Sequence, residues 1–151
     1  GALPKVLGLD IQILPHAIES LKKWTASGQI ELSECDSTSN QAVANVEKFL
    51  EHVNEPCLLV LDSNHSHDHV FRELVALAPL LPVGSTVIVA DTIVEEMPDN
   101  YYQNRPWGRG NNPYTATREF LIKYPSFELD LRWSRRSLLG ECRDGILTRR
   151  S

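Results

Sequence analysis

"CLLVLDSNHSHDHVFRELVALAPLLPVGSTVIVAD", residues 57–91, holds two apolar runs with a helical pattern between them. Each apolar run ends in an aspartate, Asp62 for the first and Asp91 for the second. Between them, Val70, Leu74 and Leu77 recur at the spacing of one helix face. Strands that are apolar along their whole length are typical of a parallel sheet buried on both faces. The stretch therefore predicts a strand–helix–strand unit with two acids at one edge of a sheet.

The rest of the chain repeats this alternation. Pro15 suits the first turn of a helix that Gly28 closes, and Ser39 or Asn40 suits the cap of a second helix. Segment 92–112 is rich in Pro, Gly, Asn and Tyr, which predicts a lid, a binding loop or a disordered loop. The predicted strands are 5–13, 30–33, 57–62, 85–91, 127–133 and 137–150, the last with a turn at 144–145; the predicted helices are 15–26, 39–53, 67–81 and 113–124. This order predicts an α/β fold with a mostly parallel sheet and helices on both faces.

Composition and charge fit a single domain over residues 1–151. The net charge is −5, which does not favour binding to nucleic acid or to an anionic membrane. The basic C-terminal part is interpreted as a solvated face with a tail, and an anionic ligand is the less favoured alternative; its arginines are Arg132, Arg135, Arg136, Arg143, Arg149 and Arg150. The three cysteines lack a CxxC pair and no signal peptide is recognisable, so we expect reduced thiols in a cytoplasmic protein.

Acids follow four of the predicted strands: Asp10, Asp36, Asp62 and Asp91. In open α/β sheets, ligands bind beyond the carboxyl ends of the strands. If the strands before Asp62 and Asp91 are neighbours, the two carboxylates form a suitable site for Mg²⁺, which prefers oxygen ligands. The alternative, in which Asp62 starts a turn and Asp91 caps a loop, is equally compatible with the spacing.

Three histidines follow Asp62 in the same loop. His65 is a candidate general base for a hydroxyl substrate near this edge, because an unperturbed imidazole titrates close to neutral pH. His67 and His69 are better interpreted as surface or capping residues at a helix start, with Ser66 or Asp68 as the cap. A zinc hydrolase that uses the histidines is a weaker hypothesis, because their spacing is not that of a zinc protease. Trp107, in the loop "RPWGRGNNP", could close over a substrate, although a packed loop without one explains it equally well.

The segments "LDSNHSHDHVFRELVALAPLLPVGSTVIVADTIVEEMP" and "RPWGRGNNPYTATREFL" resemble the cephalosporin hydroxylase family, which is similar to class I S-adenosylmethionine-dependent methyltransferases. The resemblance runs from about Val6 to Arg150. It implies a Rossmann-like sheet with a reversed last strand and a metal-assisted O-methyltransferase acting on a hydroxyl of a sugar or natural product. Asp10 would hold the cofactor ribose, Asp36 would lie near the adenine and Asp62 would also lie at the cofactor. Asp62 and Asp91 would bind Mg²⁺ and His65 would be the base.

The sequence departs from the family pattern in two respects. Ala90 stands where the family commonly has the first of two acids, so we expect weaker metal binding or none. A glycine-rich turn and its preceding strand are not found in the chain, which suggests the C-terminal portion of a longer domain, or a sheet completed by another chain or by other pairing. A homo-oligomer is compatible with the sequence. The alternative function is a degenerate methyltransferase-like binding or assembly module without catalysis.

Overall fold

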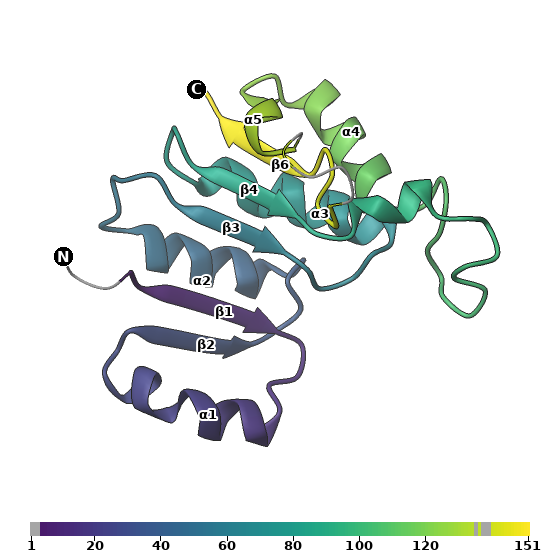
Figure 1. Cartoon of the computed structure of the whole chain (residues 1–151). Helices are drawn as coiled ribbons and strands as arrows, with labels where there is room; N and C mark the ends of the chain where they lie inside the picture. Colours follow the sequence, from purple (N-terminus) through teal and green to yellow (C-terminus); the bar gives the residue numbers. More distant parts are fainter. Residues whose placement is uncertain (1–3, 135, 137–139) are drawn as a thin grey trace. The chain divides into compact units, whose positions relative to one another are not determined.

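The computed structural model describes residues 4–134, 136 and 140–151 and divides into two compact units, Gly1–His52 and Val53–Ser151. The first unit holds β1 (Val6–Asp10), α1 (Pro15–Ala26), β2 (Ile30–Glu34) and α2 (Asn40–Leu50). The second holds β3 (Leu58–Leu61), α3 (His67–Leu77), η1 (Ala78–Leu80), β4 (Thr86–Val89), η2 (Thr92–Glu96), α4 (Pro113–Lys123), β5 (Phe127–Leu129), α5 (Leu131–Ser134) and β6 (Ile146–Arg149). Figure 1 shows these elements along the chain.

In the first unit, β1 and β2 form a two-stranded parallel sheet in which Val6 pairs with Ile30 and Asp10 with Glu34. Helix α1 begins at Pro15 and ends before Gly28, whose φ of 71° is left-handed, as predicted. The apolar face of α1 is only partly covered: Ala17 and Leu21 are half-buried, Ile18 and Trp24 are exposed, and no residue of the helix is fully buried. A two-stranded sheet offers too little surface to bury two helices, so this unit has a small core at Cys35, Ala42 and Val46.

The second unit contains a four-stranded sheet in the order β3-β4-β6-β5. Strands β3 and β4 are parallel, and β6 runs antiparallel to both of its neighbours. The fold is therefore α/β with a mixed sheet and a reversed last strand, as expected. Most of the core lies here: Val87 and Val89 of β4 are buried with Leu74 of α3 and Phe120 of α4, and Figure 1 shows α3 on the far side of β4.

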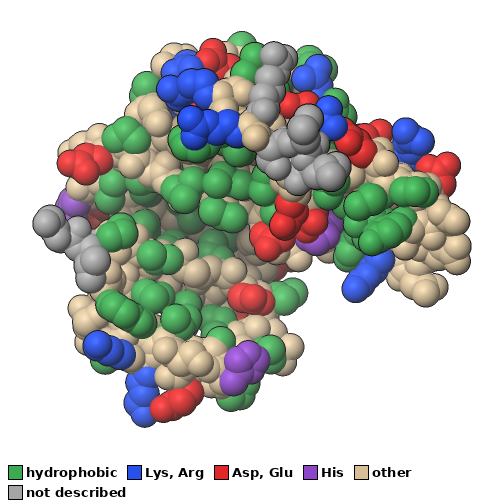
Figure 2. Space-filling view, viewed as in Figure 1, with side chains coloured by type: hydrophobic (Ala, Val, Ile, Leu, Met, Phe, Trp, Pro, Cys, Tyr) green, Lys and Arg blue, Asp and Glu red, His purple; other side chains and the backbone are tan. Residues whose placement is uncertain are grey.

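One face and one edge of β3 remain open among the described residues. Alternation along the strand buries Leu61 but leaves Leu58 62% and Val60 54% exposed. Figure 2 shows hydrophobic side chains gathered at the surface of the molecule on the side of β3 and β4 that faces the viewer. Within the described strands β3 pairs only with β4 and β1 only with β2, so each has an edge with unpaired backbone groups.

Several predicted boundaries were wrong. Strand β1 is shorter than 5–13, and only Phe127–Leu129 of the predicted strand 127–133 is extended. Asp130 accepts a hydrogen bond from the backbone N–H of Arg132, which starts the helical turn α5 instead. The predicted strand 137–150 is a strand only over Ile146–Arg149, and residues 137–139 lie outside the described residues. The long loop contains the 3-10 helix η2, which its low periodicity concealed. No described helix has the length and apolarity to span a bilayer.

Candidate active site

Parallel pairing of β3 and β4 brings two of the predicted acids to one sheet edge. Leu61 pairs with Val89, and the N–H of Ala90 donates to the carbonyl of Leu61 over 3.0 Å. Asp62 directly follows β3 and Asp91 follows β4 after one residue. Both aspartates therefore lie at the carboxyl ends of two neighbouring parallel strands, as predicted from the sequence.

His65 lies between the two aspartates. Its Nε2 atom is 3.0 Å from Oδ2 of Asp91 and 3.5 Å from Oδ1 of Asp62. One ligand atom from each of the three side chains falls within 4.8 Å of the others, and no second group of this kind occurs in the described part of the chain. The side chains of His65 and Asp91 are about three-quarters buried, whereas that of Asp62 is 59% exposed. The cluster is thus open to solvent on the Asp62 side.

The backbone at Asp91 is unusual. Its φ of 55° and ψ of 23° lie in the left-handed region, which a non-glycine residue rarely adopts. Asp91 precedes the first turn of η2, but its carboxylate makes no capping hydrogen bond there. In the Asp62 loop, Asn64 forms the local turn by accepting bonds from the N–H and hydroxyl of Ser66. The alternative prediction was that Asp62 starts a turn and Asp91 caps a loop. Neither carboxylate does so, and both face His65.

The donor atoms of this cluster fit a divalent cation with a small adjustment. Mg²⁺ binds oxygen ligands at about 2.0–2.1 Å, so two of its ligands lie at most about 4.2 Å apart. The observed upper limit of 4.8 Å would have to shrink by about half an ångström, which an exposed carboxylate such as that of Asp62 can supply by rotation. Ala90 is buried beside them and provides no side-chain oxygen.

His67 and His69 point to other partners. The ring of His67 contacts Thr115 Oγ1 at 2.8 Å and Glu119 Oε2 at 3.0 Å, which joins α3 to α4. Glu119 has a lowered pKa, because Lys123 and His67 both bond to its carboxylate. His69 lies 3.2 Å from the hydroxyl of Ser63. Both histidines lie in the first turn of α3, as predicted, but their side chains are about four-fifths buried and bonded rather than at the surface.

The helix start at His67 is capped from outside α3. Ser66 occupies the cap position, but its side chain makes no capping bond. The amide oxygen of Asn111 accepts from the N–H of His67 over 3.0 Å instead, and the Asn111 side chain also donates to the carbonyl of Pro106. This long-range cap connects the loop to α3, and it could not be predicted from the sequence around His67.

The loop from Arg105 to Pro113 packs on the cluster. The Trp107 ring meets His65 edge-on with centroids 5.0 Å apart, and the guanidinium of Arg105 lies 5.2 Å from the Trp107 ring centre. Asn112 holds the loop in place: it caps α4 and is fully buried. Its side-chain nitrogen donates to Glu95 Oε2 at 2.6 Å and to the Gly108 carbonyl at 2.8 Å. These contacts fix Trp107 against the imidazole.

Two further side chains near Asp91 were not predicted from the sequence. Burial raises the pKa of the Cys142 thiol, and the charges of Glu141, Asp91 and Asp62 raise it further. Burial, Tyr101 and Asp91 likewise raise the pKa of Tyr102. Cys142 and Tyr102 therefore lie within electrostatic reach of the carboxylates. Tyr102 lies in the loop after η2 and Cys142 lies shortly before β6, and the sequence spacing in neither segment indicated a place near Asp91.

Asp10 and Asp36 belong to the first unit, at the carboxyl end of its two strands. Asp10 is the last residue of β1, and its Oδ1 accepts from the N–H of Gln12 at 2.9 Å. Asp36 follows β2 and accepts from the N–H and hydroxyl of Thr38, both at 2.8 Å. Both are exposed. The structure thus brings Asp62, His65 and Asp91 together in one unit and Asp10 and Asp36 to one sheet edge in the other.

Comparison with known proteins gives a family match along nearly the whole chain and relatives that match part of it. The model of the family described as rhamnosyl O-methyltransferase/CmcI matches residues 2–150. Rhamnosyl O-methyltransferases of Mycobacterium bovis (strain BCG / Pasteur 1173P2) and Mycobacterium tuberculosis (strain ATCC 25618 / H37Rv) are 28% identical over 93 residues, 62% of this chain and 36% of each relative. The chain thus spans about a third of the length of these relatives.

The fold is also found among solved structures. The MycE methyltransferase of the mycinamycin biosynthetic pathway, in complex with Mg, SAH and mycinamycin VI, aligns with a TM-score of 0.51 and 15% identity over 97% of this chain and 36% of that one. A second MycE structure, with Mg and SAH, has a TM-score of 0.51 and 16% identity over 97% of this chain and 37% of that one. With a family model that matches nearly every residue, the chain belongs to the rhamnosyl O-methyltransferase/CmcI family.

Proposed function

We propose that this protein is an S-adenosylmethionine-dependent O-methyltransferase that acts on a hydroxyl of a sugar or natural product. The observation that carries the proposal is the cluster of Asp62, His65 and Asp91 at the carboxyl ends of two parallel strands. Family membership supports it, and the Mg and SAH of the MycE complexes support the choice of cofactors.

In this proposal Asp62 and Asp91 hold Mg²⁺, which would bind the substrate hydroxyl and lower its pKa. His65 takes the hydroxyl proton. Its Nε2 faces both carboxylates, so Nε2 is the ring atom that a hydroxyl held beside Asp62 and Asp91 would reach. Bound S-adenosylmethionine would supply the methyl group, which would pass from the sulfonium sulfur to the deprotonated substrate oxygen and leave SAH. Trp107 restricts the His65 ring, which helps to position the base.

The first unit would supply the cofactor contacts. We propose that Asp10 accepts hydrogen bonds from the ribose hydroxyls, that Asp36 lies near the adenine and that Asp62 also contacts the cofactor. Asp10 Oδ2 makes no hydrogen bond within the described residues, so this oxygen is available to a hydroxyl. The single bond that Asp10 Oδ1 accepts from Gln12 orients the carboxylate without occupying both oxygens.

We also propose that residues 1–151 form part of a longer methyltransferase domain. The unpaired edges of β1 and β3 and the exposed Leu58 and Val60 support this, because a completed sheet would cover them. The short share of the curated relatives that the chain covers points the same way. The three cysteines are free thiols, which is compatible with the cytoplasmic location that we propose.

Calorimetric titration with S-adenosylmethionine, with and without Mg²⁺, tests the proposal. Micromolar cofactor binding that Asp10→Asn weakens would support it, with the exposed Asp68→Asn as a matched control. Absence of cofactor binding by the full-length gene product would remove it.

A second candidate is a degenerate methyltransferase-like module that binds without catalysis. Ala90 favours it, because a buried methyl group replaces an acid that the family commonly has. Cofactor binding without Mg²⁺ binding or methyl transfer would select this candidate. The zinc hydrolase hypothesis receives no support, since His67 and His69 bond to Glu119, Thr115 and Ser63, outside the one described cluster.

A further inference from the structure

Ser63, the residue after Asp62, is hydrogen-bonded to helix α3. Its hydroxyl oxygen lies 2.6 Å from Oε1 of Glu73 and 3.2 Å from Nε2 of His69. A hydroxyl has one proton, and the shorter distance is typical of an O–H group that donates to a carboxylate. Ser63 therefore donates to Glu73, and its oxygen accepts from the Nε2–H of His69. Both partners belong to α3, four residues apart, so these bonds attach the Asp62 loop to the helix.

Glu73 is a charged residue in the buried face of α3. Its side chain is only 2% exposed, and the other buried residues of the helix are Val70, Leu74 and Leu77. Its second oxygen, Oε2, is buried without a hydrogen-bond partner in the described part of the chain. Burying a carboxylate with an unmet acceptor costs free energy, and an apolar side chain of similar volume is often no less stable. Stability of the fold therefore does not explain why a glutamate occupies this position.

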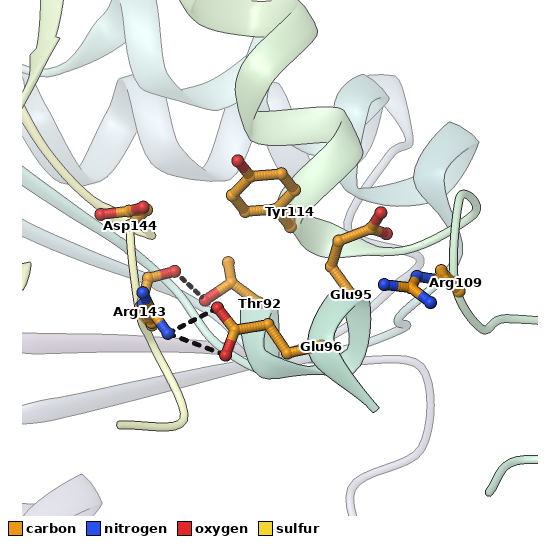
Figure 3. A pocket seen from close by; sticks show the side chains of 7 residues that line it. All are labelled: Thr92, Glu95, Glu96, Arg109, Tyr114, Arg143 and Asp144. Carbon is orange, nitrogen blue, oxygen red and sulfur yellow. Dashed lines mark hydrogen bonds and ion pairs between the residues drawn. The ribbon is translucent and has the colours of Figure 1, made fainter. Parts of the chain in front are cut away.

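Asp91 is held firmly by the segment that follows it. The hydroxyl of Thr92 lies 2.5 Å from the carbonyl oxygen of Arg143, and the guanidinium of Arg143 pairs with Glu96 at 2.6 Å. Figure 3 shows these contacts, which join η2 to the turn before β6 at the wall of a pocket of about 330 Å³. One of the two proposed metal ligands is thus fixed independently of α3.

Asp62 has less direct support. Its carboxylate is 59% exposed and makes one close contact within the described residues, to Nε2 of His65 at 3.5 Å. The donor atoms of the cluster lie within 4.8 Å of one another, whereas a cation such as Mg²⁺ needs its ligands at most about 4.2 Å apart. The place of Asp62 therefore has to be set to about half an ångström. The bonds of Ser63, whose Cα lies about 3.8 Å from that of Asp62, can set it.

We propose that Glu73 is a positioning residue for Asp62: through the Ser63 hydroxyl, it fixes the loop so that the Asp62 carboxylate can share a cation with Asp91. The inference rests on the proposed function and adds a residue that touches neither metal nor substrate. The buried carboxylate lowers the stability of the unit and restrains the loop. Removing Glu73 should therefore weaken metal binding without unfolding the protein.

Calorimetric titration of the whole chain with Mg²⁺, paired with thermal melting, tests the inference. Glu73→Leu removes the acceptor and the buried charge, and the exposed Ser63 hydroxyl can then bond to water. We expect the Mg²⁺ dissociation constant to rise at least about tenfold, the lower end of the usual effect of losing a group that orients a metal ligand. The melting temperature should stay at or above that of the parent, whereas loss of a merely structural contact would lower it.

Further variants separate the hydrogen bond from the charge. Glu73→Gln keeps a bonding partner for Ser63 but loses the charge, so its Mg²⁺ affinity should stay close to that of the parent. Asp68→Asn removes an exposed charge from the first turn of α3 and should leave the affinity unchanged. Ser63→Ala removes the same bond from the other side, so it should weaken the affinity even if Glu73→Leu does not fold.

Two results would overturn the inference. The first is an Mg²⁺ affinity that Glu73→Leu, or Ser63→Ala in its place, leaves unchanged. The second is an equal loss of affinity in Glu73→Gln and Glu73→Leu, which would assign the effect to charge rather than to position.

Nitrogen-15 relaxation of the metal-free chain tests the restraint on the loop separately from the metal. The amides of residues 62–64 should have order parameters near the rigid-backbone value of about 0.85 in the parent and lower values in Glu73→Leu. A parent that shows this difference but binds no Mg²⁺ would remove the metal from the proposed function and keep the positioning role. A parent that binds Mg²⁺, with the same affinity and order parameters in Glu73→Leu, would do the reverse.

Discussion

Asn112 is the residue whose removal should most directly loosen the site. Its side chain accepts from the N–H groups of Tyr114 and Thr115 and donates to Glu95 and Gly108. In Asn112→Ala the lost helix cap costs about 1 kcal/mol, and the bonds to a carboxylate and a carbonyl about 1–3 kcal/mol together. Because both acceptors keep another backbone partner, from Gly110 and Asn111 respectively, we expect a total near 3 kcal/mol.

Hydrogen exchange followed by mass spectrometry measures this cost locally, which suits a chain of two compact units. A loss of 3 kcal/mol should lower the protection of peptides covering 113–123 about 100-fold. Asn100→Ala is the matched control, because Asn100 is an exposed residue of the same loop, and its protection should stay close to that of the parent. If both variants protect α4 equally, Asn112 does not hold the loop and the account of how Trp107 is fixed against His65 is wrong.

Three further predictions concern charge. Asp91→Asn should abolish calorimetric Mg²⁺ binding while the melting temperature stays near that of the parent, since asparagine also tolerates the left-handed backbone, and Asp68→Asn should change neither. The pKa of Glu119 is lowered from its ordinary value of 4.5, so this group contributes stability above that pH that is lost as the pH falls through the folded pKa. Glu119→Gln or Lys123→Ala should therefore flatten the pH dependence of the melting temperature in the acid range, and an unchanged profile would contradict this. Cys142 should alkylate with a pH midpoint above that of a free thiol, measured on its peptide by mass spectrometry, and a normal or low midpoint would argue against its burial beside the carboxylates.

The part of the fold that periodicity describes was predictable. The ends of the strands before Asp62 and Asp91 were predicted correctly, because a continuous apolar run stops where the chain leaves the sheet. The segment after Phe127 was not, because Asp130 starts a turn through a side-chain bond that alternation does not reveal. Propensity also could not show that the apolar stripe of α1 stays unburied, since burial depends on what the neighbouring sheet can cover.

The candidate site likewise has a part that the sequence predicted and a part that it did not. The grouping of Asp62, His65 and Asp91 followed from topology, whereas the roles of His67 and His69 depended on α4, which lies far along the chain. The pocket lined by η2, the start of α4 and the turn before β6 could not be predicted from the sequence, because its charged residues come from separate segments and each resembles an ordinary surface position.

The backbone at Asp91 also limits how this position can change over generations. A left-handed φ of 55° admits glycine, asparagine and aspartate at little cost and penalises bulkier side chains. Lineages that lose the carboxylate should therefore carry asparagine or glycine at this position, and glutamate, although also an acid, should be rare. Ala90 does not have a left-handed backbone, so its conformation does not restrict substitution, but its burial limits the size of the side chain there. A saturation library scored for folding alone should show a narrow profile at 91 and a size-limited but conformationally unrestricted one at 90.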